Sequence, residues 1–153
     1  MTSFIFSVFL ACGDTTNDTA ETPIEISNAG PEGSSHMENS CGPTDGGALT
    51  LTVGIIESDE CLGAVDPDFS VVLQIWNSTI ESGVTLPILS DQAFFYHAQT
   101  VQSAIDGEVD FNFEGDWQDG IEFSGFYWIE LEDGLIIQGG FEGVHCGGEI
   151  FCG

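Results

Sequence analysis

The chain contains no lysine and no arginine, and this absence excludes more functions than any other feature of its sequence. Its 153 residues include 26 Asp and Glu and three His, so the formal net charge is −26 at pH 7 with His neutral. Without Lys there is no P-loop, no Schiff-base lysine and no general-base lysine. Without Arg there is no bidentate clamp for phosphate or carboxylate. Without a basic surface we expect no binding of nucleic acid.

The missing cations also decide what can hold the fold together. No ion pair between Lys or Arg and a carboxylate can form, so cohesion must come from apolar burial, backbone hydrogen bonds and disulfides. Repulsion between the carboxylates favours solubility and opposes compactness. Two interpretations of the acidity stay open: a solvated surface suited to a saline habitat, or a surface that binds cations.

Long apolar runs are also scarce, and the main one precedes Cys12. Residues 4–11 are apolar except Ser7, which is shorter than the ~20 residues that a transmembrane helix needs. Ala11 comes directly before Cys12, and a polar, Thr-rich stretch begins after Gly13. This arrangement resembles the lipidation site of bacterial lipoproteins.

The resemblance implies a lipid-modified Cys12 and membrane attachment through a lipid anchor, in which each buried methylene contributes about 0.8 kcal/mol. It places the protein in the bacterial cell envelope, at the outer membrane or cell surface, or secreted if Cys12 carries no lipid. A third interpretation makes residues 4–11 a buried strand and Cys12 an ordinary thiol.

Composition divides the chain into three parts. Residues 1–12 form the lipoprotein-type signal segment. Residues 13–40 contain many Thr, Ser, Asn, Gly and acidic residues and no aromatic residue, which predicts a disordered acidic linker. Residues 41–153 form the remaining domain, of ordinary size for one folding unit.

The domain shows a hydrophobic period of two almost throughout, which indicates half-buried strands. The predicted strands cover residues 49–55, 71–76, 109–113, 121–131 and 135–141, with a further strand starting near residue 94. Asp-Gly pairs predict turns at 106–107, 119–120 and 133–134. We therefore expect an all-β fold, an antiparallel sandwich or small barrel of six to eight strands, stabilised by disulfides.

Four cysteines remain after Cys12: Cys41, Cys61, Cys146 and Cys152. In an oxidising compartment they imply two disulfides, with three possible pairings. We favour a bond that joins the start of the domain to its end, from Cys41 to Cys146 or Cys152. The alternative is a zinc ion bound by His145, Cys146, Cys152 and another Cys, although no Cys-x-x-Cys pair is present.

The domain is also similar to a group of uncharacterised, predicted bacterial lipoproteins. The likeness implies a small secreted β-domain and no particular activity. It lies in the opening Cys41-Gly42-Pro43-Thr44-Asp45-Gly46 and in the closing pattern of Gly125-Phe126-Tyr127, Asp133-Gly134, Gly140-Phe141 and Cys146.

One acidic turn is a candidate calcium site. The run from Asp110 to Asp116 imitates the start of an EF-hand loop, but Ile121 occupies the position of the required bidentate Glu. An EF-hand is therefore excluded. A looser calcium site formed by Glu114, Asp116 and Asp119 stays open, because a divalent ion would relieve their mutual repulsion.

The aromatic residues are candidates for ligand binding. Phe126 and Trp128 share one face of a predicted strand, and Trp117 lies in an acidic turn. If that strand is buried on both faces, these residues belong to the core. If one face is open, they form an aromatic platform edged by carboxylates for a carbohydrate or a protein partner, whose identity the sequence does not specify.

The sequence offers no catalytic residues, since it lacks both Gly-x-Ser-x-Gly and His-Glu-x-x-His. We predict a membrane-anchored, non-enzymatic surface or periplasmic β-domain with a structural or binding role, assisted by calcium if the acidic turn binds it. The alternative is a secreted, carboxylate-dependent hydrolase.

Overall fold

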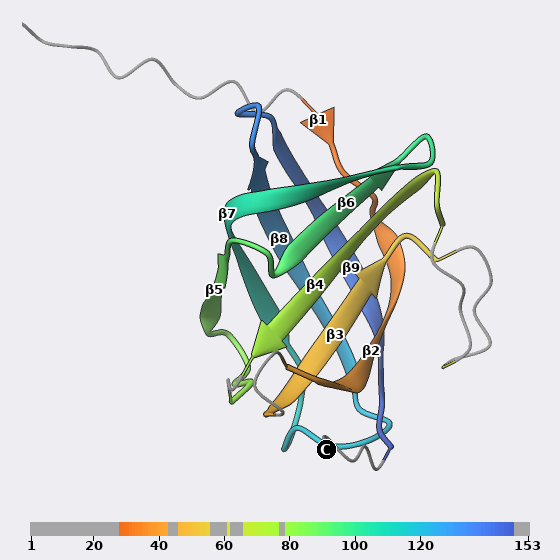
Figure 1. Ribbon diagram of the computed structural model, residues 1–153. Helices are drawn as coiled ribbons and strands as arrows, with labels where there is room; N and C mark the ends of the chain where they lie inside the picture. Colours follow the sequence, from red (N-terminus) through yellow and green to blue (C-terminus); the bar gives the residue numbers. More distant parts are fainter. Residues whose placement is uncertain (1–27, 43–45, 56–60, 62–65, 77–78, 149–153) are drawn as a thin grey trace, which may run out of the picture.

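The computed structural model describes residues 28–42, 46–55, 61, 66–76 and 79–148, which form strands and connections without any helix (Figure 1). One sheet contains all nine strands of this part of the chain. They are β1 (Asn28–Ala29), β2 (Gly33–Cys41), β3 (Gly47–Val53), β4 (Phe69–Trp76), β5 (Thr85–Leu89), β6 (Ala93–His97), β7 (Thr100–Asn112), β8 (Glu122–Leu131) and β9 (Ile136–Cys146). No helix in these residues could cross a membrane.

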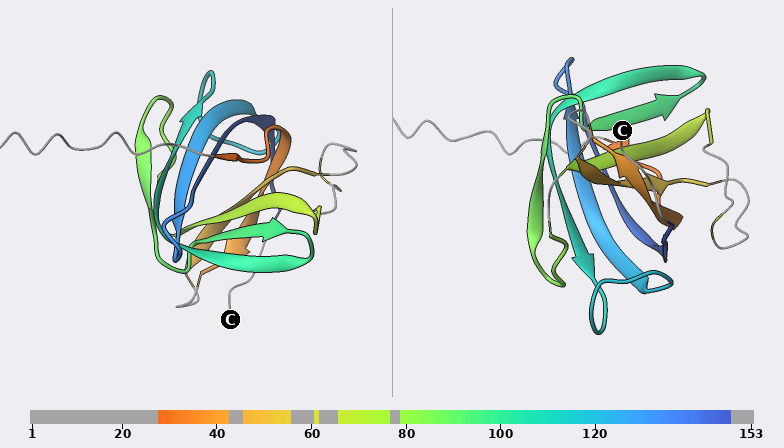
Figure 2. Two further views of the ribbon diagram at one scale, coloured as in Figure 1. Left: turned by 90° about the horizontal axis from the view of Figure 1, so that it is seen from above. Right: turned by 60° about the horizontal axis from the view of Figure 1, so that its bottom comes forward.

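Seven of these strands close into a barrel, which confirms the expected all-β fold. The ring runs β2–β3–β4–β6–β7–β8–β9 and returns to β2 (Figure 2). An odd number of strands cannot close with antiparallel pairs alone, and the one parallel pair of the ring is β2–β9. β6 and β5 pair one after the other with the same edge of β7. β1 pairs with β9 outside the ring.

Alternate positions of each strand point into the barrel and form its core. In β8, for example, Phe123, Tyr127 and Ile129 are buried, whereas Phe126 between them is exposed. Each fully buried aliphatic or aromatic side chain stabilises the fold by about 1.5–3 kcal/mol. The largest completely buried side chains are Tyr127, Phe111, Met37, Leu51, Leu73, Ile88, Ile129, Leu131 and Ile137.

The predicted turn at Asp106-Gly107 is wrong, because both residues lie inside β7. The strand pairs with β6 over 100–103 and with β5 over 106–110, and its register against β8 shifts between Ala104 and Asp106. Gly107 is needed at this irregularity, since a Cβ there would lie 2.5 Å from the carbonyl oxygen of Trp128. Glycine is favoured both in tight turns and where two backbones approach closely, so the Asp-Gly pair did not reveal which of the two occurs here.

The turn between β8 and β9 is confirmed. The Gly134 amide donates to the carbonyl oxygen of Leu131 at 2.9 Å, and Gly134 has φ +81°. Glycine enters this left-handed region without the steric cost that other residues bear. The Asp133 carboxylate accepts a hydrogen bond from the Leu135 amide at 3.0 Å.

The folded body begins earlier than the predicted boundary at residue 41. β2 is a central strand of the barrel, held by β3 on one side and β9 on the other. Met37 is its only fully buried apolar side chain, so the strand depends on backbone pairing and its sequence has the composition of a linker. The predicted signal segment and Cys12 lie outside the described residues.

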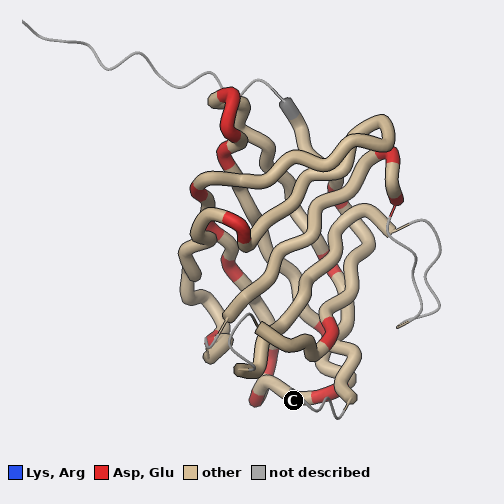
Figure 3. The backbone as a smooth tube through the Cα atoms, in the orientation of Figure 1, with Lys and Arg blue, Asp and Glu red and all other residues tan. Residues whose placement is uncertain are grey.

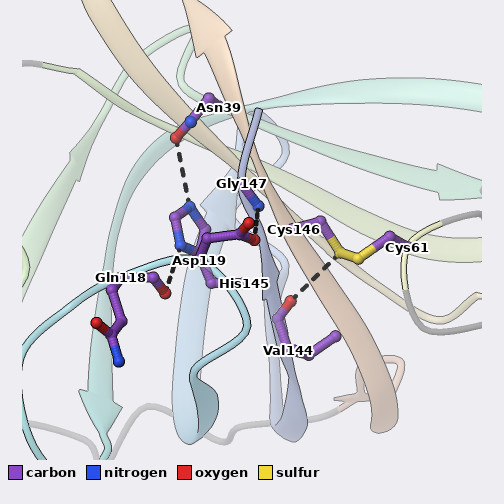
Figure 4. Close-up of a disulfide and its surroundings, with 8 residues drawn as sticks. All are labelled: Asn39, Cys61, Gln118, Asp119, Val144, His145, Cys146 and Gly147. Carbon is purple, nitrogen blue, oxygen red and sulfur yellow. Dashed lines mark hydrogen bonds between the residues drawn. A yellow bond between two sulfur atoms is a disulfide. The ribbon is translucent and has the colours of Figure 1, made fainter. Parts of the chain in front are cut away.

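A disulfide joins Cys61, in the connection from β3 to β4, to Cys146 at the end of β9 (Figure 4). Of the two pairings that we favoured for Cys41, the one with Cys146 is therefore wrong, and the one with Cys152 stays a prediction. The zinc alternative is wrong for the same reason, because the Cys146 sulfur is bonded to sulfur and cannot act as a thiolate ligand. Cys41 is itself disulfide-bonded, and Cys152 lies outside the described residues.

Candidate binding surface

The outer face of β8 carries the two aromatic residues that the sequence proposed for ligand binding. Phe126 and Trp128 alternate with buried Tyr127 and Ile129, so both rings point away from the core. Phe126 is 42% exposed, which is unusual for a phenylalanine in a central barrel strand. The strand is therefore open on this face.

A column of three carboxylates runs beside these rings on β7. Asp106, Glu108 and Asp110 occupy alternate positions, with Gly107 and Val109 turned inward between them. Successive members are roughly 6.6 Å apart along an extended strand. We call these three residues the acidic ladder.

The ladder and the rings are paired across the strands. Glu108 lies opposite Trp128, and Asp110 lies opposite Phe126. The indole N–H of Trp128 donates to Glu108 Oε2 at 3.1 Å, and the Phe126 amide donates to Asp110 Oδ1 at 3.3 Å. These hydrogen bonds orient the carboxylates while leaving most of their acceptor capacity free for a ligand.

Two neighbouring strands extend the surface. Pro87 and Leu89 of β5 lie across the ladder from the rings, opposite Glu108 and Asp106, and Leu89 is 60% exposed. On the other side Gly140 of β9 lies opposite Phe126 and leaves one flank of the ring uncovered. We call the acidic ladder with Phe126, Trp128, Pro87 and Leu89 the ladder face. It can offer apolar contact, π-faces and negative charge together.

Trp117, the third predicted binding residue, belongs to a different cluster. Its ring packs against Phe113 at 5.1 Å, Phe123 at 5.7 Å and Phe111 at 6.0 Å between ring centroids. Phe111 and Phe123 are core residues, so Trp117 closes one end of the barrel. The spacing of sequence positions could not distinguish this role from that of Phe126 and Trp128.

His145 stabilises the same end of the barrel through polar contacts of both ring nitrogens. Its Nδ1 lies 2.9 Å from the carbonyl oxygen of Gln118, and its Nε2 lies 3.3 Å from Asn39 Oδ1 (Figure 4). Its ring lies 4.9 Å from that of Trp117. The side chain thus connects β9, β2 and the connection from β7 to β8.

The predicted calcium ligands Glu114, Asp116 and Asp119 are all exposed in the connection from β7 to β8. Asp119 Oδ1 accepts a hydrogen bond from the Gly147 amide at 2.6 Å, so this carboxylate holds the chain that follows β9. In the part of the chain that the structure describes, no three His, Cys, Asp or Glu side chains are grouped as a metal site.

An open groove of about 970 Å³ runs over the outer ends of β8 and β9. Its lining includes exposed Glu114, Glu122 and Glu142 together with Ser34 and Asn112. This groove adds negative charge beside the ladder face. The buried polar residue of its lining is Ser35, whose hydroxyl donates to the carbonyl oxygen of Glu142 at 2.9 Å.

The phenol of Tyr127 has a clearly displaced pKa. Burial raises the pKa of the phenol well above its ordinary value of 10.0, and the negative charge of Glu32 raises it further. The hydroxyl donates to the buried carbonyl oxygen of Pro31 at 2.9 Å. The residue joins β8 to the chain before β2 and is structural.

Comparison of the chain with known protein families, with characterised proteins and with solved structures found no match.

Proposed function

We propose that this chain is a non-enzymatic, lipid-anchored domain of the bacterial cell envelope that binds a cationic polypeptide segment through its ladder face. The observation that carries the proposal is the acidic ladder lying directly beside two outward aromatic rings on a rigid barrel. Each residue of a bound segment would lie near a carboxylate of β7 and an aromatic ring of β8, because the two strands are neighbours in the sheet.

Charge favours a partner rich in Lys or Arg. A net charge of −26 attracts such a segment over long range and raises its association rate, and like-charged partners are repelled. Side chains on one face of an extended segment repeat at the same interval as the carboxylates of the ladder. An extended segment with a cation at every second residue therefore matches it.

The aromatic residues supply the affinity that charge alone lacks. Exposed ion pairs are worth only about 0–1 kcal/mol each. A Lys or Arg over the face of Trp128 or Phe126 gains about 0.5–1 kcal/mol from the ring quadrupole at an exposed site, and apolar contact adds to this. Pro87 and Leu89 offer a second apolar border on the far side of the ladder.

The packed interior favours surface binding over the alternative of a carboxylate-dependent hydrolase. The barrel is filled with apolar side chains and leaves its binding capacity on the outside. The Asp and Glu side chains of the described residues are all exposed or half-buried, whereas a catalytic acid owes its raised pKa to burial. The hydrolase therefore has less support.

Two observations support export and anchoring. The apolar run before Cys12 has the order of a lipidation site, and the Cys61–Cys146 disulfide is of a kind that persists in oxidising compartments. Cell fractionation with the intact mass of the mature N-terminus tests this part. We expect an acylated N-terminal Cys12 in the membrane fraction and release of the Cys12→Ala variant; a cytosolic chain with unmodified Cys12 would contradict it.

Binding is tested with a short peptide of alternating Lys and Thr, titrated against the full chain at low salt. We expect Trp128→Ala to weaken binding by roughly tenfold, as loss of an interface anchor does, and Glu108→Gln by a smaller factor. Glu132→Gln is the matched control, because it removes a carboxylate that is also exposed but lies off the ladder. Equal losses for Glu108→Gln and Glu132→Gln, or binding of neutral maltohexaose in place of the peptide, would refute the proposal.

A further inference from the structure

The barrel has a second face of opposite character. β3, β4 and β6 contain no Asp or Glu at all, and neither does the part of β7 that pairs with β6. Figure 3 shows these front strands free of acidic residues, which lie instead around the rims and on the strands behind. In a chain with a net charge of −26, the described strands on this side of the barrel thus carry no carboxylate.

The outward side chains of this side are apolar or uncharged polar. Thr50, Thr52 and Ser70 are outward as well, and Thr52 and Ser70 are buried. Val72, Phe94 and Tyr96 alternate with buried Val71 and Phe95, so they point to the outside. We define the neutral face by its outward residues Val72, Gln74, Phe94, Tyr96, Val101 and Ser103. The pairings Val72–Phe94, Phe94–Ser103 and Tyr96–Val101 make it continuous across three strands.

An apolar sheet face without charge gains free energy when it is covered. Val101 is 55% exposed, and the neighbouring rings are only half-buried. Burial of apolar surface stabilises by about 25 cal/mol per Å², and a stable interface buries about 800 Å² per partner.

We infer that the neutral face is the contact surface between two copies of this chain. Charge identifies the occupant. A basic segment finds no opposite charge on the neutral face and is attracted instead to the acidic ladder, which lies farther along β7. Two identical chains repel each other through every acidic surface, and the neutral face is where these copies can approach without placing carboxylates against each other.

Symmetry agrees with this assignment. An isologous contact brings the same patch together twice around a two-fold axis, so the patch must complement itself. A neutral apolar patch does so, whereas an acidic patch repels its own copy. The remaining carboxylates around the interface still repel, so the dimer is expected to strengthen as salt shortens the Debye length from about 10 Å at 0.1 M to about 3 Å at 1 M.

Sedimentation equilibrium of the full chain over a wide concentration range tests the inference. We expect the mass of a dimer, with a dissociation constant that falls at least tenfold between the two salt concentrations. Phe94→Glu places a carboxylate at the centre of the neutral face and should raise the dissociation constant at least tenfold. Phe126→Glu makes the same chemical change on the ladder face and should leave it unaltered.

Ser103→Glu is a second variant, in case Phe94→Glu fails to fold. Position 103 is already polar and lies opposite Phe94. This variant too should yield a monomer, with an unchanged circular dichroism spectrum. A wild-type chain that stays monomeric at every concentration and both salt levels would overturn the inference, and so would Phe126→Glu dissociating the dimer as strongly as Phe94→Glu. The peptide titration is independent of these outcomes, since Phe94→Glu leaves the ladder face intact.

Discussion

At the level of single residues, polar side chains stabilise the structure through hydrogen bonds to the backbone and not through ion pairs with Lys or Arg. Tyr127, His145 and Asp119 each bind a backbone carbonyl or amide of a distant segment. Such contacts need no Lys or Arg. Side-chain to backbone hydrogen bonds therefore do in this barrel what ion pairs do on many other protein surfaces.

Tyr127→Phe should lower the free energy of unfolding by about 1–2 kcal/mol at pH 7, because the buried carbonyl oxygen of Pro31 loses its donor. The pH dependence follows from the raised pKa of the phenol. The unfolded state loses its proton near pH 10 while the native state keeps it, so wild-type stability falls above pH 10, by up to about 1.4 kcal/mol per pH unit from this residue.

Urea unfolding of the two chains between pH 8 and pH 11 is the measurement, expressed as approximate free energies from linear extrapolation. The variant should lose less stability than the wild type above pH 10. Tyr96→Phe, in a half-buried position, is the control for the loss of a phenol as such. Parallel pH profiles for wild type and Tyr127→Phe would show that the buried phenol does not govern alkaline unfolding.

At the scale of strands, the sequence predicts those with strong alternation and misses those without it. β8 and β9 alternate apolar and polar or small residues over most of their length, and their inward faces are as expected. β2 has one buried apolar side chain, and β5 contains Pro87 at a sheet edge, so neither produces the pattern of a strand. Their positions depend on the backbone of neighbouring strands, which composition cannot reveal.

The candidate surface was predictable in part for the same reason. Period two places Phe126 and Trp128 on one face, but only the pairing of β7 with β8 brings the acidic ladder beside them. In the sequence, the ladder residues also occupy every second position, at 106, 108 and 110. The expected turn at Asp106-Gly107 concealed them, because an Asp-Gly pair marks both turns and bulges.

Two glycines on paired strands give a matched test of the packing. A Cβ on Gly125 would meet the Asp110 carbonyl oxygen at 2.0 Å and the Phe141 ring at 2.5 Å, whereas the nearest atom to a Cβ on Gly140 is 3.8 Å away. Gly125→Ala should therefore cost about 2–3 kcal/mol through overpacking, and Gly140→Ala should change stability by less than about 1 kcal/mol. Chemical denaturation of both variants measures this difference; similar costs would mean that β8 and β9 are not packed as described.

At the scale of the whole molecule, cohesion comes from a filled interior and covalent links acting against a large uniform charge. The Cys61–Cys146 bond closes a sequence separation of 85 residues, which is long enough for a substantial effect on the unfolded chain. In the chain-entropy account such a loop contributes about 4.6 kcal/mol.

Replacing both cysteines, as Cys61→Ser with Cys146→Ser, should thus lower the free energy of unfolding by about 3–5 kcal/mol under non-reducing conditions. Thermal and urea unfolding against the wild type provide the comparison. A double variant with the same free energy of unfolding as the wild type would show that this disulfide does not stabilise the fold.

Salt should stabilise the chain, because no ion pair with Lys or Arg exists to be weakened while repulsion among carboxylates is screened. The melting temperature should rise steadily with sodium chloride and by the same amount with potassium chloride. A melting temperature that is flat or falling with ionic strength would contradict the charge balance described here.

Mapping of the backbone amide resonances during titration with the Lys-Thr peptide locates the residues that contact a cationic segment. We expect the largest shift changes on residues 106–110 of β7 and 124–130 of β8, with β3, β4 and β6 undisturbed. Shifts spread evenly over all acidic residues, or confined to the neutral face, would contradict the binding proposal.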